Sequence, residues 1–181
     1  MSFVERYANS LGSLDLRDDE QHRATEALAA AALADLNGGS KVLFGSMLAR
    51  AKAVGVPRQV FESSTAHLAP LIRTWERAVN EKGTSRGWLK IVHPWDINAA
   101  RCMYNKIARV SLAHWLDGAC ETCHGTKIYD RRACTACAGT GREPIKGGAL
   151  EIERVKDMIS ELEGLHQSHC ARAGAKTRRA A

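Results

Sequence analysis

Four cysteines near the middle of the chain constrain its fold more than any other feature of the sequence. They lie in two short repeats, Cys120-Glu-Thr-Cys123-His-Gly-Thr and Cys134-Thr-Ala-Cys137-Ala-Gly-Thr-Gly, each of which reads C-x-x-C-x-G-T. This spacing lets a tight turn bring both sulfurs of a repeat to one ion, and Gly125 and Gly139 give backbone freedom behind each turn. Four thiolates form a closed tetrahedral shell, which predicts one structural Zn²⁺ held by Cys120, Cys123, Cys134 and Cys137.

Other uses of these cysteines stay open at this point. Each C-x-x-C could be a redox disulfide, but no thioredoxin-like alternation of strands and helices surrounds either one. Cys120 to His124 also reads C-x-x-C-H, as in covalent haem attachment, although the second repeat has Ala138 where that chemistry needs histidine. Four thiolates accept iron as well as zinc. The plainest interpretation is that a metal ion joins the helices on either side.

The composition is that of a folded protein with a basic surplus. Of 181 residues, 45% are hydrophobic and 25% are charged, close to globular averages. The first residues carry several acidic side chains instead of the apolar run of a secretory signal, and no later run is long enough to cross a bilayer. We therefore expect a cytoplasmic protein with reduced thiols and no membrane partner. Its formal net charge of +6 is compatible with a nucleic-acid partner.

Helical patterns fill most of the remaining sequence, so the expected fold class is mainly α, a helical domain with an inserted four-cysteine zinc module. Apolar periodicity, capping residues and Gly or Pro stops predict helices at 18–36, 41–54, 57–80, 97–116 and 149–162. Pro70 is expected to kink or divide the third helix, and Asp96 to cap the fourth. The segment WLKIV, 88–92, favours a short strand.

These elements predict four segments: a helical domain at 1–117, the zinc-binding module at 118–146, a C-terminal helix packing back on the body at 147–164, and a basic flexible tail at 165–181. The tail contains His166, His169 and Cys170, which have metal-ligand spacing but in a flexible segment are expected to bind nothing. The four tryptophans are expected to anchor the core: Trp75, Trp88, Trp95 and Trp115.

Two groups of residues are candidates for nucleic-acid contact. In the fourth helix Arg101, Asn105 and Arg109 recur every fourth residue, and Arg–guanine and Asn–adenine pairs are favoured in a major groove. A solvated helix face is the simpler interpretation of this spacing. The second group lies between and just after the knuckles, where a basic loop braced by zinc suits phosphate contact: Lys127, Arg131, Arg132, Arg142 and Lys146.

The sequence contains no motif of an enzyme. A phosphate-cradling Gly-rich loop, G-x-S-x-G and H-E-x-x-H are all missing from it. The metal shell predicted above also leaves no position for a water or a substrate. We therefore expect no catalytic activity and no small-molecule substrate.

The knuckle region resembles the zinc module of the lambda-type late-gene antitermination protein Q of bacteriophages. That family shows C-x-x-C-H-G-T-G and then C-x-x-C-x-G-x-G between helices, and residues 118–144, containing GACETCHGT and RACTACAGTGREP, match it. Lys127 replaces the second glycine of the first knuckle, and the loop between the knuckles is shorter. The resemblance implies the four cysteines as ligands. It also implies a factor that binds DNA and host RNA polymerase in a bacterial cell and allows read-through of terminators in late-gene expression.

A second resemblance leads to a different hypothesis. The knuckle is similar to the zinc region of DnaJ-type cochaperones, which has four such copies and binds two ions, whereas only two copies occur here. His93-Pro94 is followed by Trp95 and not by the aspartate of a J domain. The alternative hypothesis is therefore a zinc-stapled protein-interaction adaptor or a DnaJ-like cochaperone factor.

Overall fold

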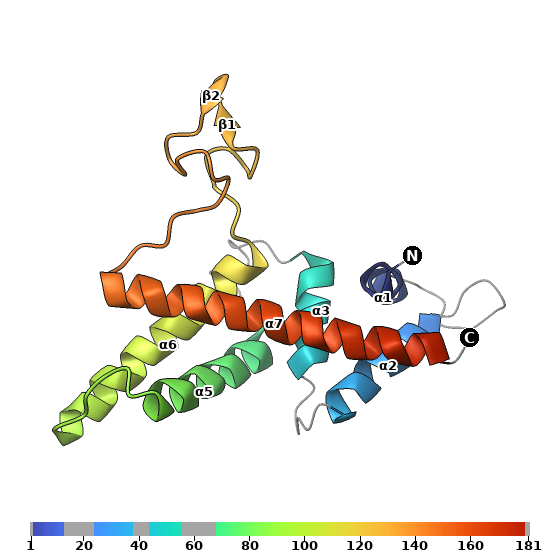
Figure 1. Cartoon of the computed structure of the whole chain (residues 1–181), viewed down its shortest axis with the longest axis horizontal. Helices are drawn as coiled ribbons and strands as arrows, with labels where there is room; N and C mark the ends of the chain where they lie inside the picture. Colours follow the sequence, from blue (N-terminus) through green and yellow to red (C-terminus); the bar gives the residue numbers. More distant parts are fainter. Residues whose placement is uncertain (1, 13–23, 38–43, 56–67, 180–181) are drawn as a thin grey trace. The chain divides into compact units, whose positions relative to one another are not determined.

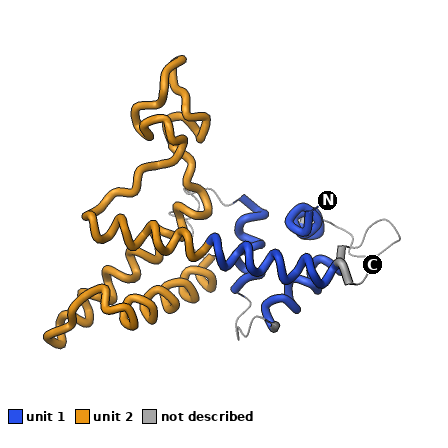
Figure 2. Tube along the Cα trace, in the orientation of Figure 1, with its two compact units in different colours: residues 1–56, 163–181 blue, residues 57–162 orange. Residues whose placement is uncertain are grey.

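The computed structural model describes residues 2–12, 24–37, 44–55 and 68–179, and in these ranges the chain is mainly helical, as the sequence predicted (Figure 1). The helices are α1 (Phe3–Gly12), α2 (Ala24–Asn37), α3 (Phe44–Val54), α5 (Ala69–Ser85), α6 (Pro94–Leu116) and α7 (Ala149–Arg179). The strands are β1 (Ile128–Tyr129) and β2 (Arg132–Ala133). The chain forms two compact units, residues 1–56 with 163–181, and residues 57–162 (Figure 2).

The first unit is an alanine-rich bundle of α1, α2, α3 and the C-terminal part of α7. Helix α2 places four buried alanines on one face, at Ala27, Ala30, Ala31 and Ala34. Because alanine side chains are short, neighbouring helices can approach this face closely. The rings of Phe3 and Tyr7 stack with centroids 5.7 Å apart and pack into the same cluster as Ala49 and Ala173.

The second unit joins α5, α6 and the first part of α7 around a core of larger side chains. Inside it the Trp75 indole donates a hydrogen bond to Ser111 Oγ at 3.1 Å. Two ion pairs connect α7 to the other helices, Lys82–Glu161 at 2.6 Å and Lys106–Glu151 at 2.7 Å. The four-cysteine module lies between α6 and α7 in the chain.

The C-terminal helix is longer than the sequence predicted. Residues 165–179, expected to be a flexible tail, continue α7 as far as Arg179. This part of the helix has partners in the first unit, because Arg172 donates to the Ala34 carbonyl at 3.2 Å and Arg6 donates to Thr177 Oγ1 at 2.8 Å. The helical domain predicted for 1–117 is likewise divided between the two units.

Several local predictions were wrong. Residues 88–92 form a loop and not a strand, and within them only Trp88 is buried, while Val92 is 62% exposed. Trp95 is 67% exposed and lies outside the core, unlike the other three tryptophans. Pro70, expected to kink or divide the predicted helix at 57–80, lies in the first turn of α5, where its missing N–H is harmless. No kink interrupts α5, and residues 57–67 before it lie outside the described residues.

The start of α6 also differs from the prediction. His93 is the N-cap, and Asp96 lies inside the first turn, where its carboxylate accepts hydrogen bonds from the His93 and Val92 amides at 2.8 and 2.9 Å. These two donors lower the pKa of Asp96. Helix α1 was not predicted at all, and residues 18–23, 41–43 and 57–67 of the predicted helices lie outside the described residues. No helix in the described part of the chain combines the length and apolar character needed to cross a membrane.

Candidate metal centre

The four predicted cysteine ligands come together in one buried cluster. Their Sγ atoms all lie within 4.8 Å of one another, with Cys120–Cys134 at 4.0 Å and Cys123–Cys137 at 3.7 Å. Metal–sulfur bonds of about 2.3 Å in a regular tetrahedron place neighbouring sulfurs about 3.8 Å apart. The cluster therefore has the size and the donor set to hold one metal ion in four-sulfur coordination.

The same distances argue against a pair of redox disulfides. All four thiols are free, and the sulfur contacts of 3.7 and 4.0 Å join cysteines of different knuckles instead of the two cysteines of one C-x-x-C. His124 is exposed and has φ of 48°, almost the same as Ala138 at 49° in the second knuckle. The two knuckles thus have the same local backbone with and without a histidine, so the geometry does not depend on the C-x-x-C-H sequence.

Matching hydrogen bonds show that the module is an internal repeat with an offset of fourteen residues. Thr126 Oγ1 donates to the Cys123 carbonyl at 2.6 Å, and Thr140 Oγ1 donates to the Cys137 carbonyl at 2.7 Å. Each knuckle also supports the other, because the Cys120 amide donates to Gly141 and the Cys134 amide donates to Lys127, at 3.0 and 2.9 Å. Backbone hydrogen bonds between the two knuckles therefore hold the cysteines in place.

Left-handed backbone conformations explain the glycines behind each turn. Gly125 and Gly139 have φ of 80° and 74°, a region that L-residues with a Cβ seldom adopt. At Gly141 a Cβ would lie 2.8 Å from the Gly125 carbonyl oxygen, so the two knuckles meet through glycine backbone. Lys127, at the position equivalent to Gly141, has φ of 69°. Lys127 therefore keeps the left-handed backbone conformation of the glycine that the Q-type pattern has at this position.

The electrostatics of the cluster suit a bound cation. Burial raises the pKa of Cys137, but the Gly141 amide, which donates to its Sγ at 3.2 Å, and the neighbouring sulfurs together lower it to about 6. The Cys137 amide lowers the pKa of Cys134, while burial and the Cys137 sulfur raise it to about 11. Adjacent thiols cannot all ionise without a positive charge between them, which a divalent metal ion supplies.

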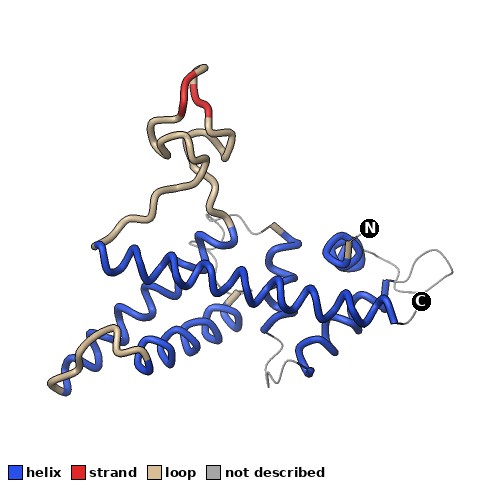
Figure 3. Tube along the Cα trace, in the orientation of Figure 1, coloured by secondary structure: helices blue, strands red, loops and turns tan. Residues whose placement is uncertain are grey.

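Between the knuckles the chain forms a small antiparallel hairpin of β1 and β2, drawn as the strand segment of Figure 3. Asp130 and Arg131, with φ of 48° and 60°, form its two-residue turn, in the left-handed conformation that fits the twist of a hairpin. Ile128 and Tyr129 of β1 are each 59% exposed. This exposed apolar pair was not predicted; its signal in the sequence is two consecutive apolar residues inside a basic loop.

Three of the predicted nucleic-acid residues lie in or beside this hairpin. Lys127, Arg131 and Arg132 are exposed, and none of the three side chains forms an ion pair with another described residue. Arg142 and Lys146 are exposed as well; the Arg142 backbone forms a bridge with Ala119 beside the second knuckle. The structure therefore places a basic and partly aromatic surface next to the metal cluster.

The residues predicted on α6 are used in part within the protein. Asn105 accepts a hydrogen bond from the Asn80 amide at 2.6 Å, and Arg109 forms an ion pair with Glu76 at 2.7 Å. Arg101 is exposed and has no such partner among the described residues. Three residues at helical spacing therefore do not form one free recognition face.

The histidines of α7 do not form a second metal cluster. His169 is fully buried, with Nδ1 3.0 Å from Asp35 Oδ1, and Cys170 Sγ lies 3.5 Å from His166 Nε2. Within the described ranges, three or more ligand side chains come close enough for a metal only at the four cysteines. His166, His169 and Cys170 thus lie in a packed part of α7 and not in the flexible tail that the sequence predicted.

No known protein family, curated protein or solved structure matches the chain.

Proposed function

We propose that this protein is a transcription antitermination factor of the bacteriophage Q type, in which one structural Zn²⁺ braces a hairpin that contacts DNA. The observation that carries the proposal is the hairpin itself, with Tyr129 and Ile128 exposed among Lys127, Arg131 and Arg132. None of these three cations forms an ion pair with another described residue, so they are available to phosphates. The role in read-through comes from the resemblance of residues 118–144 to the Q family.

Zinc is the metal we assign to the cluster. Four buried thiolates with sulfur contacts of 3.7 and 4.0 Å suit a closed tetrahedral shell. Apart from the cysteines the module buries little apolar surface, because Ile128 and Tyr129 point to solvent. Its folding free energy therefore comes largely from metal binding. The metal has a structural role, and no reaction is assigned to it.

The hairpin combines the two kinds of side chain that bind nucleic acids. Guanidinium and ammonium groups neutralise phosphates irrespective of sequence, and an exposed aromatic ring provides a face on which a base or a sugar can pack. The tight turn at Asp130 and Arg131 keeps these groups close together. Without the metal the hairpin would lose the support of both knuckles, so binding to DNA should depend on zinc.

The decisive experiment measures terminator read-through by purified bacterial RNA polymerase. The template carries the late promoter of the phage that encodes this protein. Wild-type protein is compared with Cys134→Ser, which removes one ligand, and with Cys102→Ser, which changes an exposed cysteine outside the cluster. We expect read-through with wild type and Cys102→Ser and none with Cys134→Ser. Folded, zinc-loaded wild type that gives no read-through would reject the proposal and favour the interaction adaptor.

A further inference from the structure

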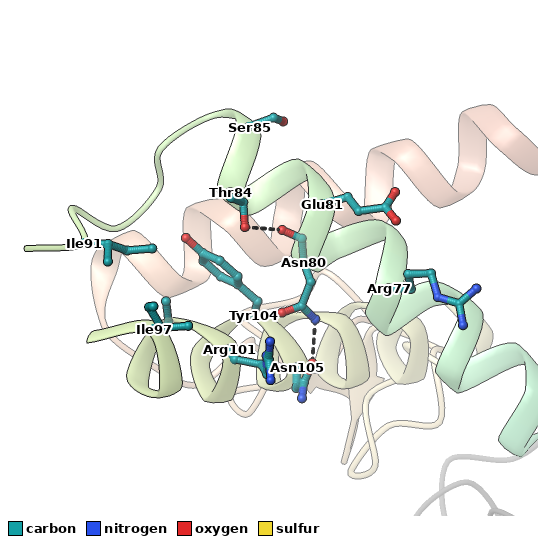
Figure 4. A pocket seen from close by; sticks show the side chains of 11 residues that line it. Arg77, Asn80, Glu81, Thr84, Ser85, Ile91, Ile97, Arg101, Tyr104 and Asn105 are labelled. Atoms are coloured by element: carbon teal, nitrogen blue, oxygen red, sulfur yellow. Dashed lines mark hydrogen bonds between the residues drawn. The ribbon is translucent and has the colours of Figure 1, made fainter. Parts of the chain in front are cut away.

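A hollow of about 580 Å³ lies between α5 and α6 in the second unit, away from the cysteine module in the chain (Figure 4). Ile91, Ile97 and Tyr104 gather at one end of it, and Arg77 lies at the other. Tyr104 is buried and donates to the Gly83 carbonyl at 3.3 Å, so its ring is held in place as an apolar wall. The hollow is therefore a preformed feature of the packing of two helices.

The apolar end opens onto an exposed apolar segment. Ile91 and Ile97 are 44% and 46% exposed, and Val92 and Trp95, between them in the chain, are exposed still further. Covering these large exposed apolar residues with a partner would be favourable, because each buried side chain removes apolar surface from water. Tryptophan and arginine next to a pocket are also the residue types that dominate binding energy at protein interfaces.

The polar end carries unpaired positive charge. Arg77 and Arg101 both line the hollow, are exposed, and form no ion pair with any described residue. Glu81 lines it too, one turn after Arg77, and is likewise unpaired, which leaves two cations against one carboxylate. Asn80 and Asn105 are bonded to each other across the floor at 2.6 Å, which leaves each amide further hydrogen-bonding capacity.

We infer that this hollow is a docking site for a polypeptide partner that inserts an apolar side chain against Ile91, Ile97 and Tyr104 and pairs an adjacent carboxylate with Arg101. Aliphatic walls gain from burying an aliphatic or aromatic side chain and offer nothing to a phosphate backbone, which favours a polypeptide over nucleic acid. This docking site is separate from the DNA contact proposed for the hairpin. It rests on the proposed function only in that RNA polymerase would be the partner.

The test starts with a displayed library of random 12-residue peptides, selected on the full-length zinc-loaded protein. We expect enriched peptides to share an apolar residue next to Asp or Glu. Binding is then followed by the methyl NMR signals of the labelled isoleucines. Such a peptide should shift Ile91 and Ile97 and leave the buried Ile107 and the hairpin residue Ile128 unchanged.

Variants decide whether the contacts are those assigned. Arg101→Glu should weaken peptide binding by roughly fivefold or more, because it removes the surface ion pair with the peptide carboxylate and replaces it with a charge that repels that carboxylate. Ile97→Ser should weaken it as well. Lys156→Glu, an equal charge reversal at an exposed position of α7 outside the hollow, should leave it unchanged.

Three outcomes would overturn the inference. These are the absence of any selected peptide that shifts Ile91 and Ile97, equal binding by wild type and Arg101→Glu, and a shift of the same two methyl signals by DNA fragments in place of peptides. Because none of these measurements involves read-through, failure of the docking site and failure of the antiterminator proposal are separate results.

Discussion

The hairpin predicts how the affinity for DNA depends on salt. If Lys127, Arg131 and Arg132 each neutralise one phosphate, they contribute about 3 × 0.9, or roughly 2.7, to the negative slope of log K against log salt. Between 50 and 200 mM salt this part of the affinity falls about 40-fold. Replacing Arg131 and Arg132 with glutamine leaves one contact, for which the fall is only about 3- to 4-fold. Contacts elsewhere add equally to both proteins, so the slopes should differ by about 1.8.

The assay is fluorescence anisotropy of a labelled duplex titrated with protein across this salt range. The matched control is the double variant Arg86→Gln with Lys156→Gln, which removes two exposed positive charges outside the module. The salt dependence of its affinity should have the same slope as that of wild type if the change in the Arg131/Arg132 variant does not come from loss of positive charge in general. Equal slopes for wild type and the Arg131/Arg132 variant would refute the assignment of the hairpin as the DNA contact.

Three further predictions concern stability and metal content. Cys137→Ser should abolish binding of one zinc per chain, measured by atomic emission, while circular dichroism changes little because the helices lie outside the module; full zinc content would contradict the ligand assignment. Gly45→Ala should destabilise the first unit by roughly 1–3 kcal/mol in urea unfolding, since the added Cβ would overlap the His169 ring and the Asp35 carboxylate. Gly164→Ala, a helical site with open space around it, is the control and should stabilise by about 0.5–1 kcal/mol. Burial lowers the pKa of His169 although Asp35 acts to raise it. As the pH falls, the His169 imidazole is therefore protonated in the unfolded chain before it is protonated in the folded chain. Stability of the first unit should therefore be full above about pH 7 and fall as the pH drops through about 6.5, the ordinary histidine value, towards the lowered pKa. His169→Gln should flatten this dependence, and a gain of stability on acidification would contradict it.

The metal cluster could be predicted because its geometry is local. Two residues between cysteines fix a turn, and the glycines behind them mark the left-handed positions seen at Gly125 and Gly139. The amphipathic helices were predicted for a similar reason, since periodicity records which face is buried. Even α1 had such a signal in Phe3, Tyr7 and Leu11, whose spacing of four places them in one cluster.

The errors arose where distant residues decide the outcome. The continuation of α7 depends on Arg172 and Thr177 finding partners more than 100 positions away in the chain. His169 meets Asp35 only because the first unit brings two helices together. The hairpin was missed for a different, local reason, because its strands of two residues are too short to show a periodic pattern. The pairing of Arg109 with Glu76 on α5 likewise could not be known from the spacing on α6 alone.

The central claim is that a metal ion in the four-cysteine cluster braces the surface that contacts DNA. It is tested most directly by withdrawing zinc from the full-length protein with a chelator while zinc content and DNA affinity are measured on the same samples. The account predicts that affinity falls in step with zinc and returns when Zn²⁺ is added back, with helical circular dichroism retained throughout. Undiminished affinity in the zinc-free protein would contradict it.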